Sequence, residues 1–154
     1  MPVTVSVLCV CLGNICRSPT AEAVLRTRAE EAGLALEVDS AGTGGWHVGH
    51  PPDRRAQAAA AARGYDLSRQ RARQVVQGDG RFDLILAMDD QNAADLRRLL
   101  PPEAHDRIAL FLDGAPETAG RSVPDPYYDD RFDHVLDLIE AAADGWVARL
   151  KAGR

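Results

Sequence analysis

Residues 3–18 read VTVSVLCVCLGNICRS, and this stretch decides the fold that we expect for the chain. Its first half (VTVSVLCV) is rich in β-branched side chains, which is typical of a buried strand. Ser18 and Pro19 predict a helix start, with Ser18 as the N-cap and Pro19 at the first helical position. Gly33 ends this helix, and residues 34–38 predict a second strand. A strand, a helix and a strand in this order predict parallel pairing through a right-handed crossover.

The remainder of the chain continues this alternation. We expect strands at residues 84–88 and 108–112, helices at residues 53–63, 90–100 and 132–150, and long loops at residues 39–52 and 115–130. The pattern has no internal repeat and predicts one α/β domain over residues 1–154, a doubly wound four-stranded parallel sheet with helices on both faces. Such sheets bind ligands beyond the carboxyl ends of their strands, so the loop after the first strand is the expected site of chemistry.

The composition excludes several classes of function. Of the 154 residues, 45% are hydrophobic and 27% charged, and the formal net charge is −5. This acidic balance and the 5% aromatic content argue against nucleic-acid binding. The chain has no long apolar run and no basic N-terminal segment followed by one, so we expect a cytoplasmic protein with no membrane contact. Only one of the 18 basic residues, Lys151, is Lys, a bias typical of GC-rich bacterial genomes.

All three cysteines, Cys9, Cys11 and Cys16, lie close together near the N-terminus. They cannot staple distant loops, and the lack of a CxxC pair or a second cluster argues against a metal site. A tight group of thiols indicates reactivity in a reducing compartment. Cys9 falls in the first strand, where we expect an inert core residue. Oxidation is expected to join Cys16 to Cys11 in a reversible disulfide that shields Cys11.

The loop of residues 11–18 (CLGNICRS) joins a strand end to a helix start, where backbone N–H groups and the helix dipole attract anions. Gly13 and Asn14 tolerate the positive φ that a tight anion-binding loop requires. Arg17 can bind two phosphate oxygens, and the positive field favours a Cys11 thiolate aimed at the phosphorus. We expect phosphate to bind at Leu12, Gly13, Asn14, Ile15, Cys16, Arg17 and Ser18. The alternative is a phosphate-binding turn with an uninvolved thiol. A nucleotide-binding loop is not expected, because its GxxxxGK[ST] motif is absent.

Residues 7–24 (VLCVCLGNICRSPTAEAV) resemble the signature of the low-molecular-weight protein tyrosine phosphatases. The similarity continues, in family order and spacing, at residues 39–42 (DSAG), Trp46, residues 87–89 (AMD) and residues 125–128 (DPYY). It therefore covers nearly the whole chain. The family implies attack of a Cys11 thiolate on phosphorus and hydrolysis of the resulting phosphocysteine by water, with no metal and no cofactor.

The resemblance also implies the acid and base of the reaction. Asp125 is the expected general acid that protonates the leaving phenolate, and then the general base for water. Taken alone, an Asp between two prolines is more often a turn former, and only its pairing with the cysteine loop favours catalysis.

Four supporting residues follow from the same resemblance. Asn14 and Ser40 resemble the hydrogen-bonding pair that holds the loop in shape. Ser18 can donate a hydrogen bond to the thiolate or serve as a plain N-cap. Asp89 can orient the loop arginine or merely cap a helix. Gln70 stands where the family often has a His that contacts Asn14.

Other residues near these loops have alternative interpretations. Ile15, Trp46, Tyr127 and Tyr128 are expected to wall a pocket for an aryl phosphate, although Trp46 can instead pack a loop. A second set has no predicted catalytic role: the surface residues His47 and His50, and the basic run Arg69, Arg71 and Arg73. For that run a solvated face is expected, and docking of acidic phosphopeptides is the alternative.

Three other functions compete with phosphotyrosine hydrolysis. Thiol-linked arsenate reductases need further cysteines downstream, and none follows Cys16. Phosphoarginine phosphatases tend to have Thr before the second loop cysteine, whereas Ile15 suits an aryl ring. A non-catalytic phosphopeptide-binding module would be expected to lack Cys11, Arg17 or Asp125, which are all present. The expected partners are phosphotyrosine-containing proteins and, by resemblance, a bacterial tyrosine kinase, and we expect a monomer that binds neither nucleic acid nor membrane.

Overall fold

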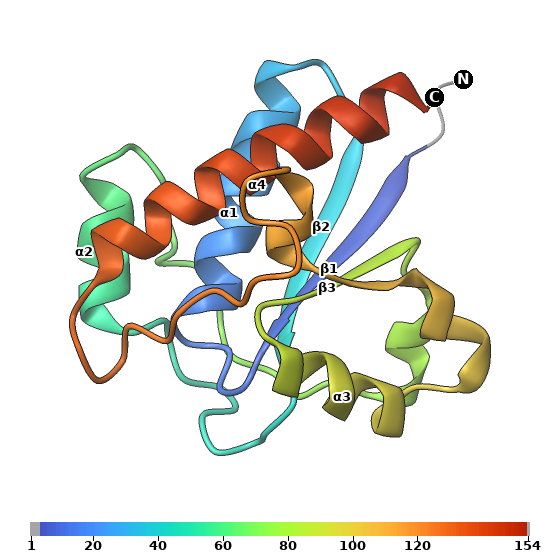
Figure 1. Cartoon of the computed structure of the whole chain (residues 1–154). Coiled ribbons are helices and arrows are strands. Elements are labelled where there is room, and N and C mark those ends of the chain that lie inside the picture. Colours follow the sequence, from blue (N-terminus) through green and yellow to red (C-terminus); the bar gives the residue numbers. More distant parts are fainter. Residues whose placement is uncertain (1–3, 154) are drawn as a thin grey trace.

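The chain folds around a four-stranded sheet in which all strands are parallel and lie in the order β2-β1-β3-β4 (Figure 1). The strands are β1 (Val5–Cys11), β2 (Leu36–Gly42), β3 (Leu84–Ala87) and β4 (Ile108–Leu110). This computed structural model describes residues 4–153, so the predicted strand start at Val3 lies outside the described residues. The order places β1 and β3 at the centre, where the chain switches direction across the sheet.

β2 continues to Gly42, so the prediction of a loop from Asp39 onward is wrong at its start. Residues 39–42 pair in register with β1, and Gly42 lies opposite Cys11. The sequence DSAG lacks the β-branched side chains on which strand prediction relies, and it is the backbone pairing with β1 that keeps it extended. As a result, Ser40 reaches the carboxyl edge of the sheet, beside the loop that follows β1.

Helices cover both faces of the sheet (Figure 1). One face carries α1 (Arg17–Glu31), α2 (Arg54–Ala61) and α4 (Phe132–Ala152), and the other carries α3 (Asp90–Leu99) and the 3-10 helix η2 (Pro102–Arg107). Successive side chains of a strand point to opposite faces. Val7 and Cys9 accordingly join the core under α1 and α4, whereas Leu8 and Val10 join the core under α3. The predicted doubly wound α/β fold is confirmed.

The apolar stripe of α4 forms much of the first core. Leu136 and Ile139 are almost completely buried, and burying one such side chain contributes about 1.5–3 kcal/mol. Trp146 also anchors the helix, because its Nε1 donates a hydrogen bond to the Phe111 carbonyl at 2.7 Å. Within residues 4–153, no helix is both long and apolar enough to cross a bilayer.

Short 3-10 helices were not predicted from the sequence. β4 ends at Leu110, and η3 (Phe111–Gly114) replaces the predicted last residues of that strand. The turn is held by Asp113, whose carboxylate accepts a hydrogen bond from the Leu110 N–H at 3.3 Å. A further 3-10 helix, η1 (Gln77–Arg81), lies before β3.

α1 begins at Arg17 with Cys16 as its N-cap, so the prediction of Ser18 as the N-cap is wrong. Ser18 lies inside the first turn and is completely buried. Its hydroxyl is bound to Asn14 and Cys11 rather than to a helix N–H. The preference of Ser for N-caps is overridden here because the preceding loop turns directly into the helix.

Three loops gather at the carboxyl edge of the sheet. They follow β1 (residues 12–16), follow β2 (residues 43–53) and precede α4 (residues 115–131). Residues of all three line one pocket. The pocket therefore lies at the carboxyl edge of the sheet, where the predicted topology places the site.

Candidate active site

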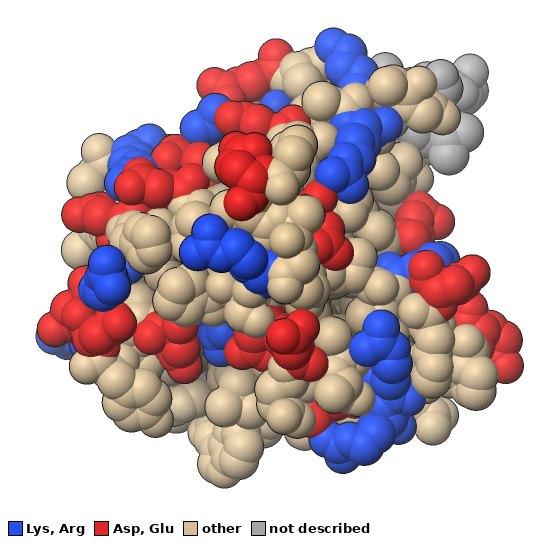
Figure 2. Space-filling model, viewed as in Figure 1, with Lys and Arg blue, Asp and Glu red and all other residues tan. Residues whose placement is uncertain are grey.

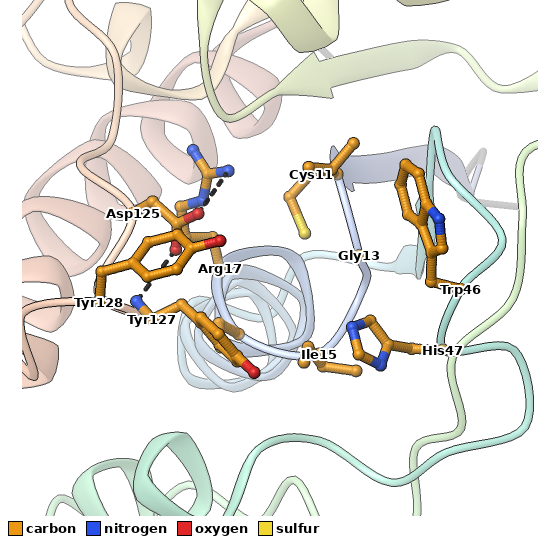
Figure 3. A pocket seen from close by; sticks show the side chains of 11 residues that line it. Cys11, Gly13, Ile15, Arg17, Trp46, His47, Asp125, Tyr127 and Tyr128 are labelled. Atoms are coloured by element: carbon orange, nitrogen blue, oxygen red, sulfur yellow. Dashed lines mark hydrogen bonds and ion pairs between the residues drawn. The ribbon is translucent and has the colours of Figure 1, made fainter.

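A pocket of about 200 Å³ opens at this edge around the Cys11 sulfur. In Figure 3, Asp125, Tyr127 and Tyr128 lie on one side of the sulfur, and Trp46 and His47 lie on the other. The lining residues are Cys11, Leu12, Gly13, Ile15, Cys16, Arg17, Trp46, His47, Asp125, Tyr127 and Tyr128. The structure thus brings together every predicted catalytic and wall residue, and the predicted supporting residues lie behind them.

The loop after β1 owes its shape to one left-handed residue. Asn14 has φ 57°, a conformation that Asn tolerates better than most residues. Gly13 does not have a positive φ, so that part of the prediction is wrong. Its lack of a side chain serves close packing instead, since a Cβ at Gly13 would lie 3.1 Å from His47 Cδ2.

The Asn14 side chain is buried and uses all of its polar groups. Its amide nitrogen donates to Ser18 Oγ at 2.8 Å and to Ser40 Oγ at 3.0 Å. Its carbonyl oxygen accepts the Arg73 backbone N–H at 3.0 Å. The predicted pairing of Asn14 with Ser40 is present, and the three bonds leave the amide a single orientation.

These contacts determine the direction of the hydrogen bonds to the sulfur. Ser18 Oγ accepts from Asn14, so its own hydrogen is free to donate to Cys11 Sγ, which lies 3.0 Å away. The Asn14 backbone N–H donates to the same sulfur at 3.2 Å. At the far end, Ser40 donates to the carboxylate of Glu22 at 2.7 Å. Glu22 is 6% exposed and was missed from the sequence, where a helical Glu resembles any surface residue.

Two sequence interpretations change in this network. Gln70 does not replace the family's His at Asn14. Its amide nitrogen donates to the Pro19 carbonyl at 3.0 Å, and its oxygen lies 3.5 Å from Ser40 Oγ. Arg73 does not belong to a solvated face, because its guanidinium binds the carboxylates of Asp39 and Asp79, each at 3.0 Å. This clamp holds the backbone N–H that Asn14 accepts.

Arg17 is held beneath the pocket by two groups. Its Nη1 donates to Asp89 Oδ2 at 2.8 Å and to the Val123 carbonyl at 3.1 Å. Burial by itself lowers the pKa of Arg17. Cys11 and Asp89 raise it by more than burial lowers it, so the net pKa is raised and the side chain stays charged. Asp89 also caps α3 by accepting the Asn92 N–H at 2.7 Å, so it fills both of the roles considered for it.

Asp125 faces Arg17 across the pocket. Its Oδ2 lies 3.8 Å from Arg17 Nη2, and its side chain is 40% exposed. Its other oxygen accepts the Tyr127 N–H at 3.0 Å, a turn contact of the kind expected for an Asp between prolines. The carboxylate is therefore both a turn former and a group positioned at the pocket.

Exposed aromatic side chains form the mouth of the pocket. Trp46 is 71% exposed and Tyr128 is 87% exposed. The Trp46 ring lines the pocket and also lies against Gly44 in its own loop, where there is no room for a Cβ, so it serves both of the roles considered for it. The Tyr127 ring meets the Tyr128 ring edge to face, with 5.0 Å between centroids. His47 was expected on the surface, but it is half-buried and lines the pocket, and its Nδ1 lies 3.4 Å from His50 Nδ1.

The three cysteines are free thiols in different surroundings. Cys9 is fully buried in the first core, and burial raises its pKa well above the usual value. Burial likewise raises the pKa of Cys16, and the carboxylate of Asp53 adds to the effect. Both thiols are thus kept neutral, while Cys11 opens on the pocket.

The charged groups at the pocket differ in arrangement from those on the surrounding surface. Over the face seen in Figure 2, acidic and basic side chains are interspersed rather than gathered by sign. Across residues 4–153, no three His, Cys, Asp or Glu side chains are grouped so that they could hold a metal ion. The groups that converge are a thiol with two hydrogen-bond donors, a buried guanidinium and a carboxylate. This combination of groups suits displacement at phosphorus by a thiol nucleophile.

Comparisons with known proteins agree with this chemistry. Residues 6–154 match the family described as Low molecular weight phosphotyrosine protein phosphatase. A Low molecular weight protein-tyrosine-phosphatase of Streptomyces coelicolor is 46% identical, over 96% of this chain and 94% of that protein. The phosphatase YfkJ of Bacillus subtilis is 41% identical, over 96% of each chain.

Solved structures give the same result. The crystal structure of YfkJ superposes with a TM-score of 0.93 at 39% identity and covers 99% of this chain and 98% of that one. Wzb of Vibrio vulnificus, in complex with benzylphosphonate, superposes with a TM-score of 0.84 at 31% identity, over 94% of this chain and 98% of that one. Sequence, fold and pocket agree, and the chain belongs to the low molecular weight phosphotyrosine protein phosphatase family.

Proposed function

We propose that the chain hydrolyses phosphotyrosine monoesters in proteins through a phosphocysteine intermediate on Cys11. The observation that carries this proposal is the convergence of Cys11, Arg17 and Asp125 on one pocket, with two hydrogen-bond donors on the Cys11 sulfur. Those donors stabilise negative charge on sulfur, which is the form that attacks.

In the first step, the Cys11 sulfur attacks phosphorus opposite the leaving phenolate. A sulfur–phosphorus bond forms while the phosphorus–oxygen bond to the aryl group breaks, and Asp125 gives its proton to the departing oxygen. The non-bridging oxygens are bound by Arg17 and by the loop N–H groups of Leu12, Gly13, Ile15, Cys16 and Ser18. The Asn14 N–H, which was expected to bind phosphate, donates to the Cys11 sulfur instead. Phosphate binding competes with Asp125 for Arg17, which frees the carboxyl group to face the leaving oxygen.

In the second step, Asp125 acts in reverse. Its carboxylate takes a proton from water, the water oxygen attacks phosphorus, and the bond to Cys11 breaks. The sulfur returns to negative charge, in reach of the Ser18 hydroxyl and the Asn14 N–H. Asn14, Ser40 and Asp89 act indirectly, by holding the loop and Arg17. The positive charge of Arg17 and the loop amides makes a metal or cofactor unnecessary.

The pocket walls favour an aryl phosphate. Ile15, Trp46, Tyr127 and Tyr128 offer apolar and aromatic surface to a ring. The structure of the relative Wzb contains benzylphosphonate, which, like phosphotyrosine, combines an aromatic ring with a tetrahedral phosphorus group. Phosphoarginine is the alternative substrate on this scaffold, and Ile15 disfavours it because it offers no polar contact to a guanidinium. A non-catalytic phosphopeptide-binding module is disfavoured by the presence of Cys11, Arg17 and Asp125.

The biological setting follows from the reaction. The substrates are phosphotyrosine-containing proteins, and a bacterial tyrosine kinase would supply them. We expect a cytoplasmic monomer that acts without nucleic acid or membrane.

The test is phosphate release from a phosphotyrosine peptide and a phosphoarginine peptide, in the presence of EDTA. We expect turnover of phosphotyrosine, loss of turnover in Cys11→Ser, and little activity on phosphoarginine. A preference for phosphoarginine would overturn the substrate but not the nucleophile. Folded, reduced protein that turns over neither peptide would favour the binding module.

A further inference from the structure

Arg55, in the first turn of α2, connects two of the loops that build the pocket. We propose that Arg55 is a positioning residue that sets the place of Asp125 and Tyr127 relative to the phosphate-binding loop. The inference deepens the proposed function and rests on it for its kinetic part. Nothing in the sequence pattern marks Arg55, which is one of two adjacent arginines at a helix start.

Toward the loop that carries Asp125, Arg55 makes several contacts. Its Nη2 donates to the Tyr127 carbonyl at 3.0 Å, and its Nη1 binds the carboxylate of Asp130. The guanidinium carbon lies 5.4 Å from the centroid of the Tyr127 ring and 5.0 Å from that of Phe132. Asp130 itself has φ 60°, an unfavourable conformation that the surrounding contacts must hold.

Toward the phosphate-binding loop, the connection runs through Asp53. The Asp53 carboxylate accepts the Arg55 backbone N–H at 2.8 Å and its Nε and Nη2 at 3.2 Å each. The Asp53 backbone N–H donates to the Ile15 carbonyl at 2.8 Å. An unbroken series of hydrogen bonds therefore joins Ile15 to Asp53, Arg55 and Tyr127. Burial by itself raises the pKa of Asp53, but the hydrogen bonds from Arg55 lower it by more. The Asp53 carboxylate therefore stays ionised and keeps its bonds to Arg55.

The acid depends on this connection because its own attachments are few. Asp125 accepts the Tyr127 N–H, and its only other polar contact in the described structure is the 3.8 Å pair with Arg17. A bound phosphoryl group engages Arg17 and weakens that pair. During the reaction the Arg55 contacts then become the main attachment of the Asp125 turn to the rest of the site.

The contacts call for an arginine. One guanidinium serves the Tyr127 carbonyl, Asp53 and Asp130 at once and also faces two aromatic rings, which a single ammonium cannot do. Arg55 is 42% exposed and Asp130 is 70% exposed, so the ion pair itself adds little to stability. Loss of Arg55 should therefore affect the position of the acid more than the folding of the chain.

The kinetic test compares Arg55→Lys and Arg55→Ala with the native protein on aryl phosphates. Protonation by Asp125 matters for a basic leaving group such as tyrosine and little for an acidic one such as nitrophenol. We expect kcat/KM for a phosphotyrosine peptide to fall about tenfold in both variants, a part of the 100- to 10,000-fold that acid catalysis supplies. The kcat/KM for nitrophenyl phosphate should change less than about twofold, because it reports only the steps up to loss of the leaving group and not the later hydrolysis in which Asp125 acts as base. Inhibition by inorganic phosphate should be unchanged. Arg54→Ala is the matched control, because Arg54 is exposed and makes no side-chain hydrogen bond or ion pair in the described structure.

A second measurement does not depend on activity. Amide hydrogen exchange of residues 125–131 should quicken in Arg55→Ala and stay native in Arg54→Ala. Equal loss on all aryl phosphates, or unchanged kinetics, would overturn the inference, as would native exchange in that loop. If the native protein hydrolyses no phosphate ester, the proposed function fails, and the exchange data alone decide whether Arg55 positions the loop.

Discussion

The Ser18 hydroxyl points its hydrogen at the Cys11 sulfur, 3.0 Å away, because its oxygen already accepts a hydrogen bond from the Asn14 amide. The hydrogen bonds continue outward from Asn14: its amide also donates to Ser40 at 3.0 Å, and Ser40 donates to Glu22 at 2.7 Å, nearer than its other acceptor, Gln70, at 3.5 Å. The Glu22 carboxylate on α1 thus helps to orient, through Ser40 and Asn14, the Ser18 hydroxyl that faces the Cys11 sulfur.

Removal of the Ser18 hydroxyl should therefore slow catalysis more than it weakens phosphate binding. A hydrogen bond to a charged group contributes about 1.5–3 kcal/mol, so Ser18→Ala is expected to lower kcat about 10- to 100-fold. The measurement is kcat on a phosphotyrosine peptide, together with the inhibition constant of inorganic phosphate. A folded variant with native kcat would contradict the assigned direction of the hydrogen bond.

Glu22 should act on the reaction without touching the substrate. In Glu22→Gln the side-chain amide can donate to Ser40, which removes the one-way order of the network, and we expect kcat to fall about fivefold, near the value of one neutral hydrogen bond. Ser40→Ala should have a similar effect, and the double variant should be no worse than either single one. Additive losses in this cycle would show that Glu22 and Ser40 act separately.

The thiols should differ in reactivity as their surroundings do. Burial raises the pKa of both Cys9 and Cys16, so neither forms a thiolate at neutral pH. Iodoacetate is expected to label Cys11 alone, and inorganic phosphate should protect it. Mass spectrometry of the labelled peptides decides the point, and equally rapid labelling of Cys16 would refute it.

Oxidation offers a separate prediction. Peroxide is expected to convert Cys11 to a sulfenic acid, which then condenses with Cys16 to a disulfide that a thiol reductant reverses. Peptide mapping should find the Cys11–Cys16 linkage and recovery of activity on reduction. Sulfonic acid at Cys11 as the sole product would rule this protection out.

The pH dependence of stability should depend on Glu140, which joins α4 to α1 and to the turn after α2. It accepts from Tyr65 at 2.6 Å, Arg63 at 2.6 Å and Arg28 at 3.1 Å. Burial by itself raises the pKa of Glu140, but the bonds from Tyr65 and Arg63 outweigh it and lower the pKa overall. Because the pKa of Glu140 is lower in the folded state, the ionised carboxylate stabilises the fold at pH values above its unfolded-state pKa of about 4.3. This stabilisation is lost as the pH falls through the folded-state pKa.

Glu140→Gln should accordingly lower the free energy of unfolding by about 1.5–3 kcal/mol at neutral pH. The difference from the native protein should shrink as the pH falls from the unfolded pKa of about 4.3 through the lower folded pKa, where the native carboxylate is protonated too. Urea unfolding at neutral pH and along this acidic range measures this. Asp137→Asn is the control, since Asp137 is 67% exposed and within residues 4–153 pairs with Arg63 alone. Its effect should be below about 1 kcal/mol over the same pH range. A penalty that does not vary with pH would contradict the account.

Much of the fold could be predicted because its signals are local. The apolar runs of β1 and β3 and the stripe of α4 identify themselves within a few residues. The end of β2 could not be predicted, because residues 39–42 are extended only through pairing with β1. The start of α1 was misplaced because Ser18, a common N-cap, serves the Cys11 sulfur instead.

The site divides in the same way. Cys11 to Ser18 form one continuous segment, so their chemistry can be read from spacing and residue type. Asp125 required the family resemblance, because its partner Arg17 is 108 positions away, the difference between the two residue numbers. Glu22, His47 and Arg55 gave no sequence signal, since their roles come from long-range contacts such as the Arg55 bond to Tyr127, 72 positions along the chain.

The most direct test of the central claim is to trap the intermediate. Native protein and the Asp125→Ala variant would be mixed with a phosphotyrosine peptide, quenched rapidly in acid and mapped by mass spectrometry. The account predicts a phosphoryl group on Cys11 in both the native protein and Asp125→Ala, and none in Cys11→Ser. Steady turnover with phosphate found on another residue, or on none at any quench time while Cys11→Ser remains active, would contradict it.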